Sequence, residues 1–189
     1  MQVLIRRGAG ITQCAMTLLG LLIPATASAG EYPITVNFTG EYVTETCEIR
    51  INGSGNNEAV TLPRLTTTAL NNSGGEGGKT GFTVTLAECP GFTTVNLLFG
   101  SDYSPADTAT GNLLNQTGND YSRNVQLRIR KEDGSQIMID DRNTAQQYRI
   151  WFANTPVTHQ FYVSYFSGNA GPVTAGKVHA IAGITVDYH

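Results

Sequence analysis

Apolar and polar residues alternate along much of this chain, and this period of two is what most limits its possible fold. In the last run, residues 176–189, the odd positions are polar apart from Ile181 and Gly183. The even positions are apolar or glycine: Gly176, Val178, Ala180, Ala182, Ile184, Val186 and Tyr188. Successive side chains of a strand point to opposite faces, so such a run presents one apolar and one polar face. No segment carries a comparable apolar stripe at helical spacing, which predicts an all-β protein.

Short runs of this kind recur, separated by turn residues. We expect strands at residues 47–51, 59–62, 66–70, 81–89, 95–99, 124–130, 136–139, 148–152, 161–166 and 176–189. The pair Asp133-Gly134 predicts a hairpin between two of them, and residues 71–78 are expected to form a glycine-rich loop. Many short strands at this spacing are typical of a β-sandwich.

The first 29 residues are predicted to be a secretory signal peptide. Arg6 and Arg7 precede a short apolar run at residues 15–23, and Ala27-Ser28-Ala29 supplies a cleavage site. This run is shorter than the roughly 20 residues that span a bilayer, so no stable membrane insertion is expected. Loss of the two arginines takes the formal net charge from −3 to −5 and leaves no basic patch, which argues against a nucleic-acid partner.

Only Cys47 and Cys89 remain once Cys14 is removed with the signal peptide. Two cysteines in an exported chain predict one disulfide, with two free thiols as the alternative. The length of residues 30–189 fits one domain.

A second alternating run lies near the mature N-terminus. Residues 31–42 have Tyr32, Ile34, Val36, Phe38, Gly40 and Tyr42 at their even positions. Pro33 cannot donate a hydrogen bond to a sheet, so this is predicted to be an edge or terminal strand. An amphipathic strand at each end invites pairing with another chain. The alternation leaves open whether the two ends pair with each other or with other molecules.

Both ends resemble those of the chaperone–usher pilins. In residues 34–47 (ITVNFTGEYVTETC), Gly40 precedes the first cysteine by seven positions, as in that family. At the C-terminus, Gly176 is fourteenth from the end and Tyr188 is the penultimate aromatic residue of the pilin motif. Cys89 closes a strand of the form GF-x-V-x-L-x-x-C, and the resemblance spans residues 30–189.

The resemblance implies an incomplete immunoglobulin-like β-sandwich that a donated strand completes. A periplasmic chaperone would lend a strand, and at the outer-membrane usher the N-terminal extension of the next subunit would replace it. Residues 30–41 would be this extension, with donor residues Tyr32, Ile34, Val36, Phe38 and Gly40, and residues 42–189 would be the pilin domain. The acceptor groove would be lined by Gly176, Val178, Ala180, Ala182, Ile184, Val186 and Tyr188.

The implied function is that of a non-enzymatic structural subunit. It would pass through the periplasm to a cell-surface fimbrium, where neighbouring pilins form a head-to-tail fibre that supports cell adhesion. The short extension before Cys47 favours a minor or adaptor subunit.

Two hypotheses from other classes remain. In the first, the chain is a single-domain carbohydrate-binding adhesin in which Tyr121, Tyr148, Trp151 and Phe152 line a sugar-binding face, although sheet packing is the commoner role of such residues. In the second, it is a secreted hydrolase, but no catalytic constellation is visible. Residues 73–80 nearly match a phosphate-binding loop but lack its first glycine, so a flexible loop is expected there. His159, His179 and His189 lack metal-ligand spacing, so neither a metal nor a cofactor is expected.

Overall fold

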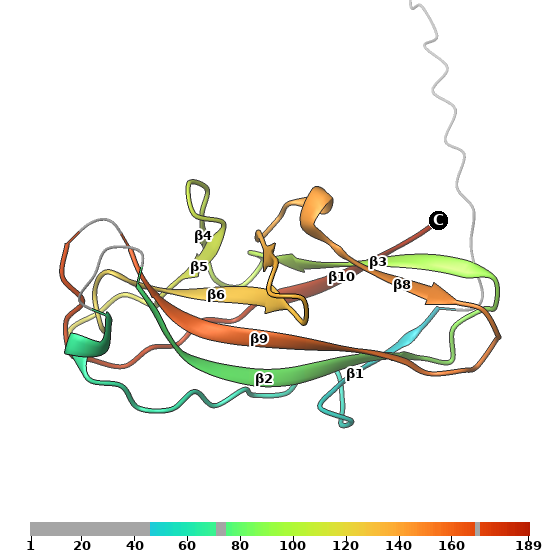
Figure 1. The fold of residues 1–189 in the computed structure, drawn as a ribbon, viewed down its shortest axis with the longest axis horizontal. Coiled ribbons are helices and arrows are strands. Elements are labelled where there is room, and N and C mark those ends of the chain that lie inside the picture. Colours follow the sequence, from blue (N-terminus) through green and yellow to red (C-terminus); the bar gives the residue numbers. More distant parts are fainter. Residues whose placement is uncertain (1–45, 71–74, 169–170) are drawn as a thin grey trace, which may run out of the picture. The chain divides into compact units, whose positions relative to one another are not determined.

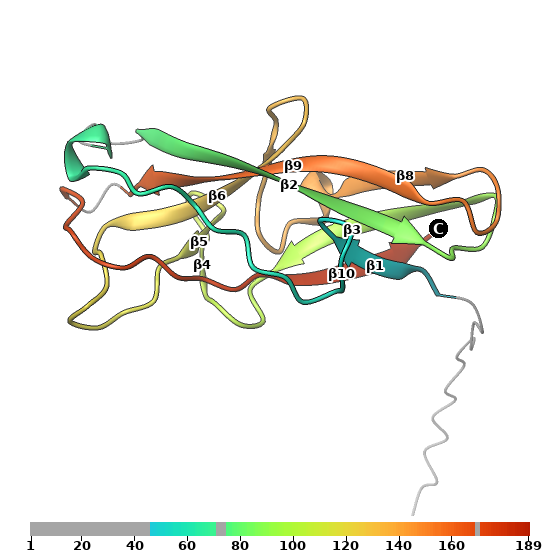
Figure 2. The same ribbon diagram turned by 90° about the horizontal axis from the view of Figure 1, so that it is seen from below.

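The computed structural model describes residues 46–70, 75–168 and 171–189, all within one unit, Tyr42–His189. Its strands form two antiparallel sheets (Figures 1 and 2). The larger sheet has the order β1-β2-β9-β6-β5-β4, with β7 beside β6, and the smaller has the order β10-β3-β8. The all-β prediction is therefore confirmed.

The strands are β1 (Glu48–Ile51), β2 (Glu76–Ala87), β3 (Thr93–Gly100), β4 (Ala106–Asp107), β5 (Asn112–Leu114), β6 (Val125–Lys131), β7 (Gln136–Ile137), β8 (Gln146–Ile150), β9 (Val157–Ser167) and β10 (Gly183–Tyr188). Helical structure in the described part of the chain is confined to two short 3₁₀ turns, η1 (Thr67–Leu70) and η2 (Arg142–Thr144). None of the helical segments described is long and apolar enough to cross a bilayer.

The period of two builds the core between the sheets. Every second residue along the inner faces of β2 and β3 is buried, namely Phe82, Val84, Leu86, Val95, Leu97 and Phe99. Phe161 of β9 joins the two sets: its ring stacks on Phe82 with centroids 5.6 Å apart and meets Phe99 edge-on at 5.4 Å. Each such side chain contributes roughly 1.5–3 kcal/mol on burial, so this cluster is a main source of stability.

Tyr148 ties the smaller sheet to the larger one. Its ring on β8 is fully buried, and its hydroxyl donates a hydrogen bond of 2.9 Å to the carbonyl of Val84 on β2. Burial raises the pKa of this hydroxyl, which therefore stays a donor. The polar group of this core residue thus has a hydrogen-bond partner on the other sheet of the sandwich.

The predicted hairpin is confirmed. Ile129 of β6 faces Ile137 of β7, and Gly134 in the turn has φ +85°. The Asp133 carboxylate accepts a hydrogen bond of 2.8 Å from the backbone N–H of Ser135, which fixes the turn.

Two predicted strands are wrong. Residues 59–62 pair with no strand among the residues described, and Thr67–Leu70 form the 3₁₀ turn η1. Val60 and Leu62 alternate because they lie on the core as extended chain, where both are half-buried, and not because they belong to a ladder. In the turn, the N–H of Ala69 bonds to the carbonyl of Thr66 at 3.0 Å, and this geometry buries Leu70.

Several element boundaries also differ from the prediction, and three of them bear on the site. Glu76–Thr80, expected in a flexible loop, belong to β2 because Glu76 pairs with Phe166, with a bulge between Gly77 and Thr80. β8 ends at Ile150, so Trp151 and Phe152 lie beyond it. The final strand begins at Gly183 instead of Gly176, because residues 177–181 bond to loops and not to β3.

Candidate functional site: the open edge of the C-terminal segment

The C-terminal segment, residues 176–189, makes all its described backbone hydrogen bonds from one side of its backbone. At its end, the N–H groups of Thr94 and His189 each bond to the other residue's carbonyl, at 3.2 and 2.9 Å. Farther upstream, the N–H of Ser122 bonds to the carbonyl of Lys177 at 2.9 Å, and that of Gln116 to the carbonyl of His179 at 3.0 Å. These backbone hydrogen bonds of the segment are therefore all made by odd-numbered residues.

Backbone groups of successive residues in a strand point to opposite sides. On β10, the N–H and C=O groups of Ile184, Val186 and Tyr188 consequently point away from β3, and the bonds of Lys177 and His179 to loops follow the same alternation upstream. β10 has only β3 as a neighbour among the strands described, so this second side is a sheet edge. An edge of this kind can hydrogen-bond to an added strand.

The side chains of the same even-numbered residues lie on the core but are incompletely covered. All are intermediate in exposure, and none is buried: Val178, Ala180, Ala182, Ile184, Val186 and Tyr188. Six of the seven residues predicted to line the groove thus share one apolar face, and Gly176 is the exception. What sequence reasoning did not assign is a second apolar row, formed by Ile49, Ile51, Val60 and Leu62, which is also half-buried against the core. The sequence did contain a pattern that marks them, because each pair, Ile49 with Ile51 and Val60 with Leu62, is separated by one polar residue.

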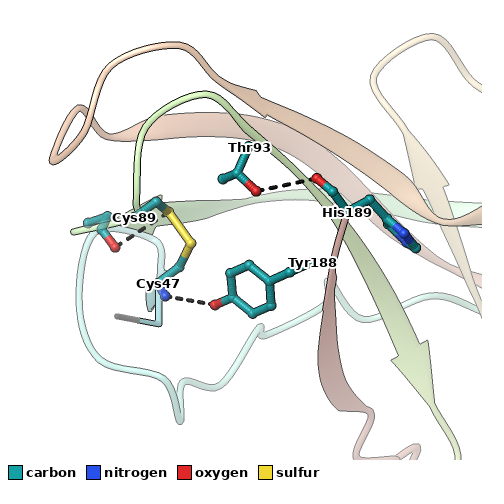
Figure 3. The surroundings of a disulfide bond; sticks show 6 residues. Cys47, Cys89, Thr93, Tyr188 and His189 are labelled. Atoms are coloured by element: carbon teal, nitrogen blue, oxygen red, sulfur yellow. Dashed lines mark hydrogen bonds between the residues drawn. A yellow bond between two sulfur atoms is a disulfide. The ribbon is translucent and has the colours of Figure 1, made fainter. Parts of the chain in front are cut away.

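β1, which carries part of this second row, is the edge strand of the larger sheet. Its start lies beside the end of β10, because the hydroxyl of Tyr188 accepts a hydrogen bond of 2.7 Å from the backbone N–H of Cys47 (Figure 3). Two sheet edges, one from each sheet, therefore meet at this point, and neither pairs with another strand among the residues described.

The predicted disulfide is present at this junction. Cys47 and Cys89 are bonded, with Cα atoms 4.2 Å apart (Figure 3). It links the entry of β1 to the connection between β2 and β3. The start of the domain is thereby held beside Tyr188.

At the other end of the segment, Gly176 lines a pocket of about 620 Å³ together with Leu65, Leu70 and Val178. A Cβ at Gly176, whose φ is +156°, would lie 2.6 Å from the carbonyl carbon of Tyr121 and would also clash with the backbone nitrogen of Ser122. Glycine is therefore required by the close approach of this backbone, and the pocket lies beside it.

The donor residues Tyr32, Ile34, Val36, Phe38 and Gly40 lie outside the described residues. In the described ranges, no group of three or more His, Cys, Asp or Glu side chains could hold a metal ion. His159 packs edge-on against Tyr148, with ring centroids 4.5 Å apart, and burial lowers its pKa.

The four aromatic residues considered for a sugar-binding face are also dispersed. Tyr148 is in the core, and Tyr121 lines a different pocket. Packing does not account for Trp151 and Phe152, which are 63% and 70% exposed.

Comparisons with known proteins give matches in sequence and in fold. A family model described as "Fimbrial protein" matches residues 36–189. Similar proteins include the major fimbrial subunit SMF-1 of Stenotrophomonas maltophilia, 26% identical over 89% of this chain and 100% of that protein. The fimbrial protein FimX of Bordetella pertussis is 28% identical over 90% of this chain and 94% of its own length.

Two solved structures share the fold. One is a structure of a chaperone–usher pilus, with a TM-score of 0.57 and 16% identity, covering 86% of this chain and 99% of the other. The second is the P pilus rod subunit PapA, with a TM-score of 0.56 and 14% identity, covering 76% and 99% of the two chains.

Proposed function

Because this chain belongs to the fimbrial protein family, we propose that it is a structural subunit that polymerises by accepting a strand from a neighbouring subunit and donating one of its own. The observation that carries the proposal is the open edge of residues 176–189, whose even-numbered residues present both backbone groups and half-buried apolar side chains. Strand addition to a sheet edge uses these two features, since backbone bonds give affinity and alternate side chains give register.

The donated strand is the run at residues 31–42. Its side chains Tyr32, Ile34, Val36 and Phe38 would enter the space between the two apolar rows, and Gly40 would pass where backbones approach closely. Burial of four such side chains at roughly 1.5–3 kcal/mol each sets an upper bound of about 6–12 kcal/mol. Each new main-chain hydrogen bond adds about 1 kcal/mol net.

The same open edge defines the partners. Before assembly, it requires a temporary cover, which a periplasmic chaperone would supply by lending a strand. Exchange for the next subunit's extension would take place at an outer-membrane usher. A head-to-tail contact of this kind does not close on itself, so it produces a fibre on the cell surface. This role involves no catalysis, cofactor or nucleic acid.

The rank of the subunit within the fibre stays a prediction. The short extension before Cys47 favours a minor or adaptor subunit, which would support adhesion by linking other parts of the fibre. The ratio of this chain to other subunits in purified fimbriae, measured by quantitative mass spectrometry, tests it. A fibre in which this chain predominates would contradict the minor rank without affecting the assembly mechanism.

Strand donation is tested by placing a charge on each face of the extension. Phe38→Asp puts a carboxylate on the inserting face, and Thr39→Asp puts the same charge on the opposite face as a matched control. Each full mature chain is co-produced with its cognate chaperone. We expect both variants to bind the chaperone and only Thr39→Asp to form sedimentable polymer. Equal polymerisation of the two variants would overturn the proposed donor face.

A further inference from the structure

Three aromatic side chains are exposed on two connections at the same end of the domain. Phe92 follows the turn between β2 and β3, while Trp151 and Phe152 begin the connection between β8 and β9. They are 84%, 63% and 70% exposed, among the largest values for apolar residues in the described part of the chain. We call these three residues the aromatic pole.

The two connections are held together firmly. The N–H of Asn154 bonds to the carbonyl of Cys89 at 3.0 Å, and a Cβ at Gly91 would lie 2.7 Å from the backbone nitrogen of Ala153. Phe92 and Trp151 line one hollow of about 380 Å³ together with Thr94, Gln147 and Arg149. The aromatic rings are therefore displayed on a fixed surface and not on independent loop tips.

The backbone carries strain at this surface. Phe92 has φ +56° and Glu88 has the same value, a conformation that residues with bulky side chains rarely adopt. Strained positions that also expose a large apolar side chain cost free energy twice, once in the backbone and once in solvation. Such costs persist where they serve binding.

The disulfide fixes where the aromatic pole lies. Cys89 is three residues before Phe92, and its Cα is 4.2 Å from that of Cys47, which lies at the start of the described chain. Figures 1 and 2 show the β2–β3 and β8–β9 connections at the end that holds the C-terminus, opposite η1. The aromatic pole is thus at the same end of the domain as Cys47, five residues after Tyr42.

Chain length then limits the distance to the subunit that receives the extension. If residues 31–42 are inserted in a neighbour's groove, five Cα–Cα steps connect Tyr42 to Cys47, which reach at most about 18 Å. A contact that repeats without closing joins two different surfaces. For an extension that pairs antiparallel to residues 176–189, Tyr42 lies at the Gly176 end of the neighbour's groove. This end of one subunit then approaches that end of the next, where half-exposed Leu65 lines the pocket with Gly176.

From this geometry we infer that Phe92, Trp151 and Phe152 form a second contact surface, which packs against the η1 end of the subunit that accepts the extension. The inference rests on the proposed function, because it requires strand donation. Aromatic residues are enriched at the centres of protein interfaces, where rigid apolar rings exclude water. The surface would make the joint between subunits a packed contact instead of a free linker.

Trp151 is the only tryptophan in the chain, so its fluorescence reports on this surface directly. The full mature chain is compared in two states: assembled into fibres, and held as a monomer by an excess of free peptide with the sequence of residues 31–42. The groove is filled in both states, but only the fibre contains a neighbour at the aromatic pole. We expect a blue shift of the emission and loss of acrylamide quenching in the fibre alone.

The outcomes separate the two proposals. Fibres in which Trp151 stays as exposed to acrylamide as in the peptide-bound monomer would overturn the second contact and leave strand donation intact. Failure both to bind the peptide and to form fibres would overturn the proposed function itself. Protection of Trp151 in the monomer by soluble oligosaccharides, with none in the fibre, would replace the subunit contact with a sugar-binding role.

A variant provides a second measurement. Trp151→Asp combined with Phe152→Asp should bind the peptide like the native chain but yield fibres that are shorter and dissociate at lower denaturant concentration. The matched control is Tyr103→Asp, at an exposed aromatic residue on the β3–β4 connection, with 73% exposure. Equal fibre length and stability for the double variant and the control would contradict the inference.

Discussion

Gly176 lies where the C-terminal segment passes against the backbone of Tyr121 and Ser122. The close approach allows the parallel bridge between Tyr121 and Lys177, which holds the upstream half of the open edge in place. The absence of a side chain at Gly176 therefore helps to set the position of the residues that follow it in the segment.

We predict that Gly176→Ala destabilises the domain by about 1–3 kcal/mol, because the methyl group must displace backbone atoms. Gly55→Ala is the control, since a Cβ at Gly55 would meet nothing within 4 Å. Denaturant unfolding of the peptide-bound monomers measures the difference. Similar unfolding free energies for the two variants would mean that the segment can shift at no cost.

At the scale of elements, Glu76 joins three strands of the larger sheet. Its carboxylate accepts hydrogen bonds from the Nε of Arg130 at 2.9 Å and from the hydroxyl of Ser164 at 2.6 Å. Arg128 lies 3.5 Å away. The hydrogen bond with Arg130 is the main cause that lowers the pKa of Glu76 to about 2, and the side chain is only one quarter exposed.

A carboxyl group whose pKa is lowered by folding stabilises the native state above its unfolded pKa. We therefore expect this contribution to be complete above about pH 5 and to be lost between about pH 4.5 and 2. After allowance for solvent screening it amounts to about 1–2 kcal/mol. Unfolding of Glu76→Gln should show a weaker decline of stability over this range than the native chain. If stability declined equally in Glu76→Gln and in the native chain, the Glu76 cluster would be excluded as the origin of the decline. The same would hold if the control Glu58→Gln weakened the decline as much as Glu76→Gln.

A second prediction at this scale concerns the open edge of residues 176–189. The amides of the even-numbered residues of β10, Ile184, Val186 and Tyr188, point away from β3, whereas the amides of Thr185, Asp187 and His189 face it. Amide exchange followed by NMR should be fast at the even positions of the uncomplexed chain and should slow when the peptide of residues 31–42 binds. The odd positions provide the internal control, and equal protection along β10 before binding would show that the edge is already covered.

The elements also show what sequence patterns can and cannot predict. Alternation identified β2, β3, β6 and β9 because their inner residues pack against a second sheet. It failed at residues 59–62, because Val60 and Leu62 alternate on the core without a strand partner among the residues described. Exposure of Trp151 and Phe152 was also missed, since composition favours burial of such residues. The alternation of Val178, Ala180, Ala182, Ile184 and Val186 along one half-buried face was predictable, but the burial of Ile49 and Ile51 depends on the distant pairing of β1 with β2.

At the scale of the whole molecule, the Cys47–Cys89 disulfide closes a loop with a sequence separation of 42 residues. The chain-entropy model gives about 4 kcal/mol for a loop of this size. Reduction should therefore lower the free energy of unfolding by about this amount, measured by denaturation with and without reductant. The Cys47→Ser/Cys89→Ser variant is the control, because reductant should leave its stability unchanged.

The junction of Cys47, Cys89 and Tyr188 also decides how a subunit responds to mechanical tension. In a fibre, a pulling force on the N-terminal extension would enter the domain at Cys47. The covalent bond to Cys89 would pass the load directly to the end of the long strand β2, so the four-residue strand β1 would not have to carry it. Because β2 pairs with β9 from Glu76 to Leu86, the load would then be shared with a long antiparallel pairing. The Cys47–Cys89 disulfide is therefore placed where it would also keep β1 from separating from β2 under load.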